Sequence, residues 1–218
     1  MITGSNSADH AAPIMVPTPD GAYPIFVGAG LLAQVASLMA GLNSAANKEA
    51  FSPRCALITN PRVGALYAAP VVASLHANHF EPHVIEIPEG ERYKMLDTVH
   101  AIYGQLLDAQ LDRRSPIFAL GGGVVGDVAG FVAATFLRGV PFVQLPTTLL
   151  AMVDASIGGK VAVDHPHGKN LIGAFKQPHA VIADTDALAT LPDVEFRAGM
   201  AEVVKHAIIG DAGLFRWL

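Results

Sequence analysis

The order of apolar and polar segments along the chain predicts strands that alternate with helices. Short apolar runs are typical of buried strands, and segments with apolar residues at helical spacing lie between several of them. This alternation predicts an α/β fold in which a mostly parallel sheet carries helices on both faces. The predicted strands are 54–60, 82–88, 115–120, 140–145 and 179–184, and the clearest predicted helices are 31–42, 95–111 and 127–137.

The two ends of the chain depart from this alternation. Residues 1–12 are polar and lack the apolar core of a signal peptide, so we expect a disordered tail. Residues 13–190 form the predicted α/β domain, which starts with two short strands joined by a Pro-Asp-Gly turn. Residues 191–218 have a helical pattern and are expected to begin an all-α domain. Thr190 and Asp193 are spaced for a capping box at its start.

Large apolar side chains crowd the end of the chain, at Leu214, Phe215, Trp217 and Leu218. A folded domain rarely leaves such a group uncovered. We therefore expect the sequence to be cut within the all-α domain, with the rest of that domain missing. The alternative is a short terminal helix that docks on the α/β domain.

Composition excludes several functional classes. The chain has 218 residues, of which 51% are hydrophobic and 15% charged, so we expect a sizeable core. The net charge of −5 comes without a basic run, which argues against a nucleic-acid partner. Cys55 is the only cysteine and fits a reducing compartment. No uninterrupted apolar stretch reaches the roughly 18 residues of a membrane span, and we expect a cytoplasmic protein.

A glycine-rich turn separates a predicted strand from a predicted helix. Gly121, Gly123 and Gly126 have the G-x-G-x-x-G spacing of dinucleotide-binding turns. Glycines let backbone N–H groups approach an anion at a helix N-terminus. No acidic residue follows about 20 residues on, where a ribose partner usually lies. Asp127 either caps its helix or contacts the ligand.

Charged residues are scarce in the apolar middle of the chain. Burying a charge without a partner is costly, so we expect these residues to converge on one another or on a polar ligand. Lys160 and Lys169 lie in a glycine-rich segment that predicts an ordered binding loop for phosphate or carboxylate. Ordinary surface lysines are the alternative. Between Ser115 and Ala180 the charged residues are Asp127, Arg138, Asp154, Lys160, Asp164, Lys169 and Lys176.

Three chemically active side chains share one face of a helix near the end of the chain. Glu202, Lys205 and His206 are spaced i, i+3 and i+4. Glu202 and His206 are therefore spaced to bind one metal from a single helix. A solvated Glu–Lys pair is the alternative interpretation. His165 and His167 also have metal-ligand spacing, but their loop setting favours a structural role.

Three long motifs together resemble the 3-dehydroquinate synthase family of sugar-phosphate cyclases. They are "PEGERYK", "GGGVVGDVAGFVAATFLRGVPFVQLPTTLLAMVDASIGGKVAVDHPHGKNLIGAF" and "GMAEVVKHAIIGD", and the resemblance runs from about residue 23 to 218. It implies an NAD-binding α/β domain, a helical metal-binding domain with zinc or cobalt, and a homodimer. The implied enzyme is a phosphate-eliminating lyase of the shikimate pathway. It converts 3-deoxy-D-arabino-heptulosonate 7-phosphate to 3-dehydroquinate by oxidation, phosphate elimination, reduction and aldol closure.

The resemblance also implies roles for individual residues. Glu202 matches the one metal ligand that this part of the family contributes. Substrate-pocket and catalytic positions match Arg138, Asp154, Lys160, Asn170 and Lys205. NAD contacts match Glu89, Gly90, Glu91, Arg92, Tyr93, Lys94, Gly122, Gly123, Val124, Val125, Gly126, Asp127, Thr147, Thr148, Lys160, Lys169, Ala187, Leu188, Ala189 and Thr190.

This sequence departs from the family pattern at several points. The family's other two metal ligands are histidines beyond Glu202, and the sequence ends before them, so we expect the chain alone not to turn over substrate. The resemblance does not imply a ligand role for His206, and Lys176 replaces a more usual aromatic residue or histidine. Two alternatives remain open: a related cyclase acting on another sugar phosphate, and a stand-alone nucleotide-binding module without catalysis.

Overall fold

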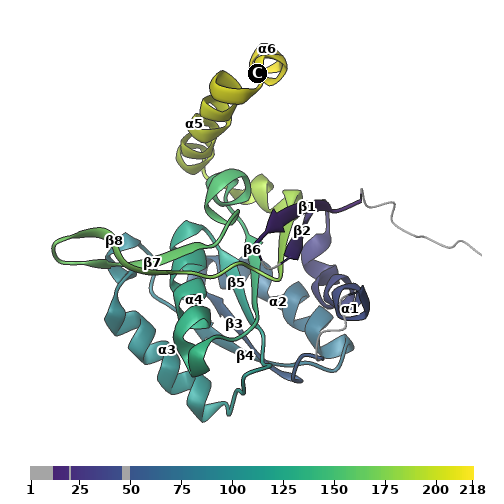
Figure 1. Cartoon of the computed structure of the whole chain (residues 1–218), viewed down its shortest axis with the longest axis vertical. Coiled ribbons are helices and arrows are strands. Elements are labelled where there is room, and N and C mark those ends of the chain that lie inside the picture. Colours follow the sequence, from purple (N-terminus) through teal and green to yellow (C-terminus); the bar gives the residue numbers. More distant parts are fainter. Residues whose placement is uncertain (1–11, 20, 46–49) are drawn as a thin grey trace, which may run out of the picture.

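A seven-stranded sheet forms the centre of the molecule (Figure 1). The computed structural model describes residues 12–19, 21–45 and 50–218, so the tail predicted over residues 1–12 lies almost wholly outside the described residues. The strand order is β1-β2-β9-β6-β5-β3-β4, with β1 antiparallel to β2 and every other neighbouring pair parallel. The strands are β1 Ile14–Thr18, β2 Gly21–Gly28, β3 Arg54–Thr59, β4 Glu81–Glu86, β5 Ile117–Gly121, β6 Phe142–Pro146 and β9 Ala180–Asp184.

Helices cover both faces of this sheet, which confirms the predicted fold class. Alternate residues of a strand point to opposite faces, and each face has its own apolar cluster. Ala56 and Ile58 of β3 pack with α3 and α4, whereas Cys55 and Leu57 pack with α1 and α2. Burial on both faces explains why the strands are continuous apolar runs in the sequence. The helices are α1 Val35–Ala45, α2 Pro61–Ala77, α3 Leu96–Asp108 and α4 Gly123–Thr135.

Short helical turns occupy most of the connections between these elements. Pro61 begins α2, and the side chain of Asn60 accepts a hydrogen bond of 2.9 Å from the Val63 N–H. This cap satisfies one of the N–H groups that a helix start leaves unpaired. The turns are η1 Leu31–Gln34, η2 Glu91–Tyr93, η3 Phe136–Arg138, η4 Ala151–Ala155 and η5 Thr185–Thr190.

The segment around Lys160 and Lys169 is a β-hairpin, so the prediction of a loop is wrong, and the binding role of the two lysines stays a prediction. Strand β7 (Lys160–His165) pairs with β8 (Gly168–Phe175) in a separate two-stranded sheet. The hairpin packs on α4 at Gly130, where a Cβ atom would lie 2.3 Å from a methyl carbon of Val161. Glycine therefore permits the close contact that buries the apolar side of β7.

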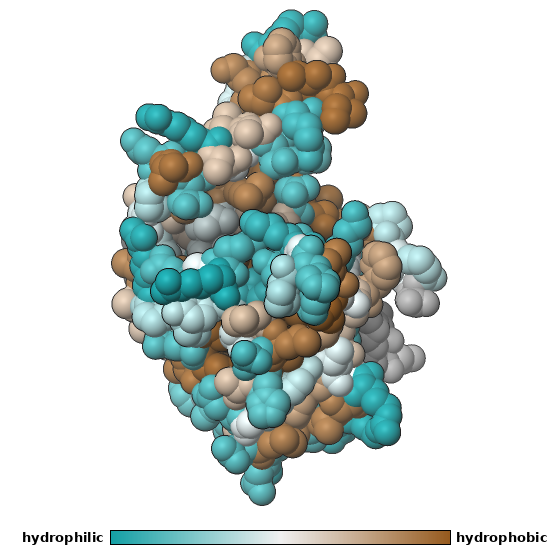
Figure 2. All heavy atoms as spheres, turned by 90° about the vertical axis from the view of Figure 1, so that its left-hand side faces the viewer, coloured by the Kyte–Doolittle hydropathy of each residue, from teal (hydrophilic) through white to brown (hydrophobic). Residues whose placement is uncertain are grey.

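Helices α5 (Asp193–Gly210) and α6 (Ala212–Trp217) project away from the sheet (Figure 1). The capping box predicted at their start is wrong, because no side chain caps α5 at Pro192 and the Thr190 hydroxyl bonds to Tyr67 instead. Apolar side chains gather on these helices (Figure 2), and Ile209 and Trp217 are 77% and 82% exposed. Within the described ranges, no helix combines the length and apolar character that crossing a membrane requires.

Candidate functional site

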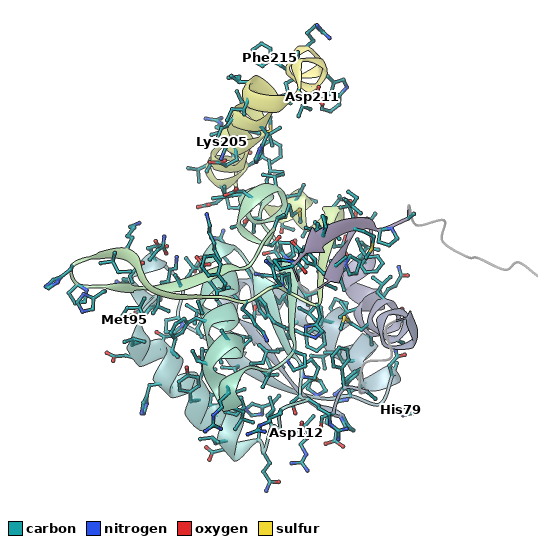
Figure 3. The ribbon with its side chains drawn as sticks, in the orientation of Figure 1. His79, Met95, Asp112, Lys205, Asp211 and Phe215 are labelled. Carbon is teal, nitrogen blue, oxygen red and sulfur yellow. The ribbon has the colours of Figure 1, made fainter. Side chains whose placement is uncertain are left out.

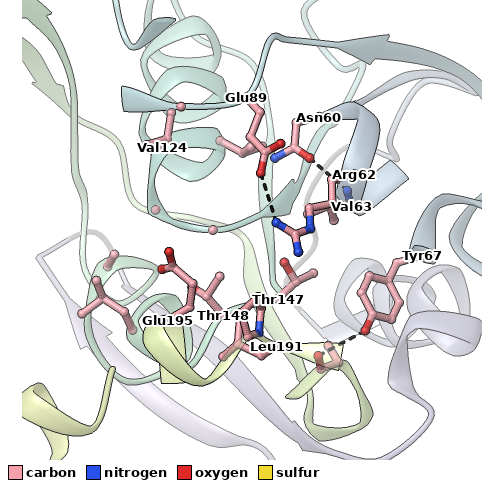
Figure 4. Close-up of a pocket in the computed structure, with 18 of the residues that line it drawn as sticks. Asn60, Arg62, Val63, Tyr67, Glu89, Val124, Thr147, Thr148, Leu191 and Glu195 are labelled. Atoms are coloured by element: carbon pink, nitrogen blue, oxygen red, sulfur yellow. Dashed lines mark hydrogen bonds and ion pairs between the residues drawn. The ribbon is translucent and has the colours of Figure 1, made fainter. Parts of the chain in front are cut away.

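A pocket of about 540 Å³ lies beyond the carboxyl ends of the parallel strands (Figure 4). Ligands of open α/β sheets bind in this position, and the volume suits a small molecule. Each of five strands contributes the segment that follows it. These segments hold Asn60 and Arg62 after β3, Glu89 to Glu91 and Lys94 after β4, Gly122 to Val125 and Asp127 after β5, Thr147 and Thr148 after β6, and Ala187 and Thr190 after β9.

The glycine-rich turn forms one wall of the pocket at the start of α4. Gly122 precedes the helix, and no side chain caps its first turn. A Cβ atom on Gly122 would lie 3.1 Å from the methyl carbon of Thr148, so the turn and the threonine loop approach closely. The free N–H groups and the helix dipole favour an anion at this place. The phosphate-binding role of the turn stays a prediction, and the uncapped helix start is the geometry that such a role requires.

Asp127 does not cap α4; it forms an ion pair with Lys94. The Lys94 Nζ atom lies 2.6 Å from Asp127 Oδ2, and these side chains are 5% and 23% exposed. Burial raises the pKa of the Asp127 carboxyl, and the hydrogen bond and charge of Lys94 oppose that rise. Much of the positive charge of Lys94 is therefore neutralised within the protein.

Lys94 also connects the pocket to the β7–β8 hairpin. Its ammonium group donates to the side-chain carbonyl of Asn170, and its backbone carbonyl accepts from the Asp164 N–H at 2.7 Å. The Asp164 carboxylate in turn accepts from the Asn170 N–H at 2.8 Å. Asn170 has a left-handed backbone, with φ of 58°, which these bonds hold in place. The hairpin and the pocket wall thus share one polar network.

Hydrogen bonds of Asp184 and Tyr67 hold the loop after β9 against the pocket. The Asp184 carboxylate accepts three backbone N–H bonds of 2.9 to 3.0 Å, from Gly30, Leu32 and Asp186. The Tyr67 hydroxyl donates to the Ala187 carbonyl at 3.1 Å and bonds to the Thr190 hydroxyl. Helix α2 and turn η5 are therefore fixed relative to each other on the side of the pocket that Figure 4 shows around Tyr67.

The pocket brings together thirteen of the twenty residues predicted to contact a cofactor. The seven predicted residues that do not line it are Arg92, Tyr93, Gly126, Lys160, Lys169, Leu188 and Ala189. Lys169 instead places its ammonium group 3.1 Å from a carboxylate oxygen of Glu91, on the surface. Ten residues that line the pocket are not among the predicted ones: Asn60, Arg62, Val63, Leu66, Tyr67, Leu150, Ala155, Leu191, Pro192 and Glu195. Asn60 and Arg62 follow a strand end, and that signal was available in the sequence.

A second group of polar side chains lies beside the pocket, where α5 meets turn η4. Asp154, Glu202 and His206 each offer a ligand atom, and these atoms lie within 4.8 Å of one another. Lys205, on the same helix (Figure 3), forms an ion pair with Glu202, which raises the pKa of the Lys205 ammonium group. Ala155, next to Asp154, lines the pocket. Carboxylates and imidazole are common ligands of zinc.

None of the five residues predicted to act on substrate lines the pocket itself. Asp154 and Lys205 belong to the group at α5, and Asn170 belongs to the Lys94 network. Lys160 begins β7 and is exposed. Arg138 follows the far end of α4, a helix of 13 residues and hence about 20 Å long. Its φ of 70° is left-handed, and it lies away from the pocket in this chain.

Comparison with known proteins gives a consistent family match. The family model described as 3-dehydroquinate synthase N-terminal matches residues 84–198. A 3-dehydroquinate synthase of Neisseria gonorrhoeae is 48% identical over 205 residues, which are 94% of this chain and 55% of the relative. That of Pelotomaculum thermopropionicum is 52% identical over 196 residues, 90% of this chain and 51% of the relative. The chain thus spans about half the length of these relatives.

Solved structures of related cyclases share the fold. A 2-deoxy-scyllo-inosose synthase complexed with carbaglucose-6-phosphate, NAD+ and Co2+ has a TM-score of 0.80 and 30% identity, over 91% of this chain and 52% of that one. The 2-epi-5-epi-valiolone synthase ValA from Streptomyces hygroscopicus, with NAD+ and Zn2+ bound, has a TM-score of 0.78 and 30% identity, over 94% of this chain and 54% of that one.

Proposed function

The chain belongs to the 3-dehydroquinate synthase family, and on that premise we propose that it forms the NAD-binding part of a 3-dehydroquinate synthase. The proposed reaction converts 3-deoxy-D-arabino-heptulosonate 7-phosphate to 3-dehydroquinate and phosphate. Oxidation of a hydroxyl acidifies the neighbouring C–H so that phosphate can leave. Reduction, ring opening and aldol closure complete the sequence.

The observation that carries this proposal is the uncapped glycine turn at the edge of an open pocket. Gly122 and Gly123 present the start of α4 to the pocket without side chains in between. We assign the diphosphate of NAD to this position, because a helix N-terminus stabilises negative charge. Thr147 and Thr148 line the same wall and offer hydroxyl groups to the cofactor.

The polar group at α5 fits the divalent metal that the family implies. Glu202 supplies a carboxylate, and the donor atoms of Asp154 and His206 lie within 4.8 Å of it and of each other. When bound, NAD would supply the hydride acceptor and donor, and a zinc or cobalt ion held by these residues would polarise the reacting oxygens. Lys205 then places a positive charge beside the substrate, while Asp154 stands at the border between this group and the pocket. Lys160, Asn170 and Arg138 remain predicted substrate residues.

A related cyclase is the second candidate, because solved structures of two other synthases share the fold. Their identity to this chain is 30%, against 48% to 52% for the 3-dehydroquinate synthases, so we favour the latter. Phosphate release measured on the gene product that contains this chain separates the two. We expect release from the heptulosonate phosphate; release from sedoheptulose 7-phosphate or glucose 6-phosphate alone would favour another cyclase.

Calorimetric titration of NAD into the chain tests the cofactor assignment directly. We expect binding to the wild type and at least a tenfold loss in Gly123→Val, whose side chain would enter the pocket. Gly104→Val is the matched control, because a Cβ atom there meets nothing within 4 Å and Gly104 lies on α3. Unchanged binding in Gly123→Val would refute the assignment.

A homodimer and a cytoplasmic location also belong to this proposal and rest on the family resemblance.

A further inference from the structure

We propose that a second cavity binds a small zwitterion, namely an α-amino acid with an apolar side chain. The cavity has a volume of about 250 Å³ and lies at the amino ends of β3 and β4, whereas the larger pocket lies beyond their carboxyl ends. Each of these strands is six residues long, so about 20 Å separates the two places. Figure 3 labels His79 and Asp112 at this end of the molecule, opposite Lys205.

Two opposite charges line the cavity without pairing to each other. Arg54 of β3 and Glu81 of β4 are partners in the parallel register, and adjacent strands are about 4.8 Å apart, so an ion pair would be within reach. Arg54 instead donates from Nη1 to the backbone carbonyl of Gln110 at 2.8 Å. None of the ion pairs among the described residues involves Arg54 or Glu81. The cavity therefore offers one positive and one negative group to a ligand.

The guanidinium group of Arg54 suits the carboxylate of an amino acid. Its hydrogen bonds within the described part of the chain use only Nη1, which leaves the Nε and Nη2 donors for a planar carboxylate. The bond to Gln110 already restrains the side chain, so binding costs less in conformational entropy. His76 and His83 also line the cavity and offer ring nitrogens to the same carboxylate.

Glu81 and two helix ends favour a positive charge in the same cavity. His76 lies in the last turn of α2, and Ala109 directly follows α3, and both residues line the cavity. The C-terminal end of a helix carries a partial negative charge. The ammonium group of an amino acid would therefore be stabilised by the Glu81 carboxylate and by both helix ends.

The rest of the lining is apolar and suits a ligand of small size. Leu111 is 7% exposed and belongs to the apolar cluster that also holds Ala56 and Ile85. It lines the cavity together with Ala109 and Pro82. The volume is below the roughly 300 Å³ at which pockets for drug-sized ligands begin. The cavity thus combines an apolar surface for a side chain with the charges that recognise an amino acid backbone.

Titration of the chain with L-leucine, followed by calorimetry and NMR, tests the site. We expect saturable binding of one molecule per chain, with shifts of the amide resonances of Glu81, His83, Ala109 and Leu111. Isocaproate lacks the ammonium group of leucine, and isopentylamine lacks its carboxylate. Each should bind at least about tenfold more weakly, because a hydrogen bond to a charged group contributes that much or more.

Variants of the two charged residues assign the binding to this cavity. Arg54→Gln and Glu81→Gln should each weaken leucine binding at least about tenfold. Arg113→Gln and Glu86→Gln are the matched controls, because both residues are exposed and neither lines the cavity, and they should bind leucine as the wild type does. Circular dichroism of each variant verifies that the fold is retained.

Three results would overturn the proposal: no saturable binding of leucine to the wild type, equal affinity for isocaproate, or wild-type affinity in both cavity variants. The inference does not depend on the proposed function, because neither Arg54 nor Glu81 lines the larger pocket. Titration of NAD into the same variants keeps the two proposals separate, and NAD affinity should equal that of the wild type.

Discussion

Lys94 and Asp127 form a nearly buried ion pair at the border of the pocket, with 2.6 Å between Nζ and Oδ2. The two residues come from different connections of the sheet, the first after β4 and the second within α4. Lys94 is further bonded to Asn170 of the hairpin. One lysine therefore links the pocket wall, the glycine-turn helix and the β7–β8 hairpin.

Lys94→Met should destabilise the protein by about 3 kcal/mol, because it leaves the Asp127 carboxylate without its partner in a desolvated place. Urea unfolding followed by circular dichroism measures the change. Lys169→Met is the control, since its ion pair with Glu91 is exposed, and such pairs contribute about 1 kcal/mol or less. Equal losses in the two variants would contradict the structural role of the buried pair.

Gly199→Ala should separate α5 from η4. The added methyl group would lie 2.6 Å from the Leu150 nitrogen and 2.7 Å from the Leu149 Cβ atom, and overpacking of this kind costs about 1–3 kcal/mol. We expect a lower melting temperature and weaker Zn2+ binding. Gly210→Ala lies at the end of the same helix with nothing within 4 Å, and it should change neither. Wild-type stability in Gly199→Ala would show that α5 and η4 are not closely packed at this position.

Cys55 should make stability fall with rising pH in the alkaline range. Burial, and to a smaller extent the charge of Glu81, raises the pKa of its thiol from 9.0 to about 12. Above pH 9 the unfolded chain loses this proton while the folded chain keeps it, so the unfolded state is favoured as the pH rises towards 12. The slope is about 1.4 kcal/mol per pH unit.

Urea unfolding of the wild type and Cys55→Ala at several alkaline pH values isolates the effect of this thiol. Other groups titrate in both proteins, and the wild type should lose stability more steeply with pH. A constant difference between the two proteins across this range would mean that Cys55 is ionised or exposed in the folded state.

Arg138→Ala should leave NAD binding unchanged, although the family resemblance places Arg138 in the substrate pocket. The residue lies beyond the far end of α4, which is 13 residues long, whereas the glycine turn lies at its start. Calorimetry on this variant beside Gly123→Val provides the comparison. A tenfold loss of NAD affinity in Arg138→Ala would contradict the position of Arg138 at the far end of α4 from the cofactor pocket.

The main sheet was predictable because its strands are buried on both faces. The run from Ile117 to Leu120 is apolar throughout, and both of its sides pack against helices.

The β7–β8 hairpin was not predicted, because its strands lack a continuous apolar run. Glycines at 158 and 159 and the His-Pro-His turn suggested a loop, and the alternation of Val161 and Val163 is short. The contact of β7 with Gly130 and the bonds of the hairpin to Lys94 hold it on the body, and no local pattern reveals either.

The site was predictable in part. The position after a strand and the spacing of the glycines predicted the turn at Gly122 and Gly123. Helical spacing predicted that Glu202 and His206 lie on one face of a helix. The pairing of Asp127 with Lys94 was not predictable, because an acidic residue near a helix start equally suits a cap. Asp154 joins Glu202 and His206 solely through the packing of α5 on η4, which depends on the tertiary structure.

The separate pairing of the β7–β8 hairpin makes its turn a suitable place for protein engineering. The two strands hydrogen-bond to each other in a sheet apart from the seven-stranded one, and His165, Pro166 and His167 at their connection are exposed. Extra residues or a fluorescent label inserted there would leave the parallel ladder untouched. Because Asn170 and Lys94 connect the hairpin to the pocket, the insertion belongs at the turn and not within the strands.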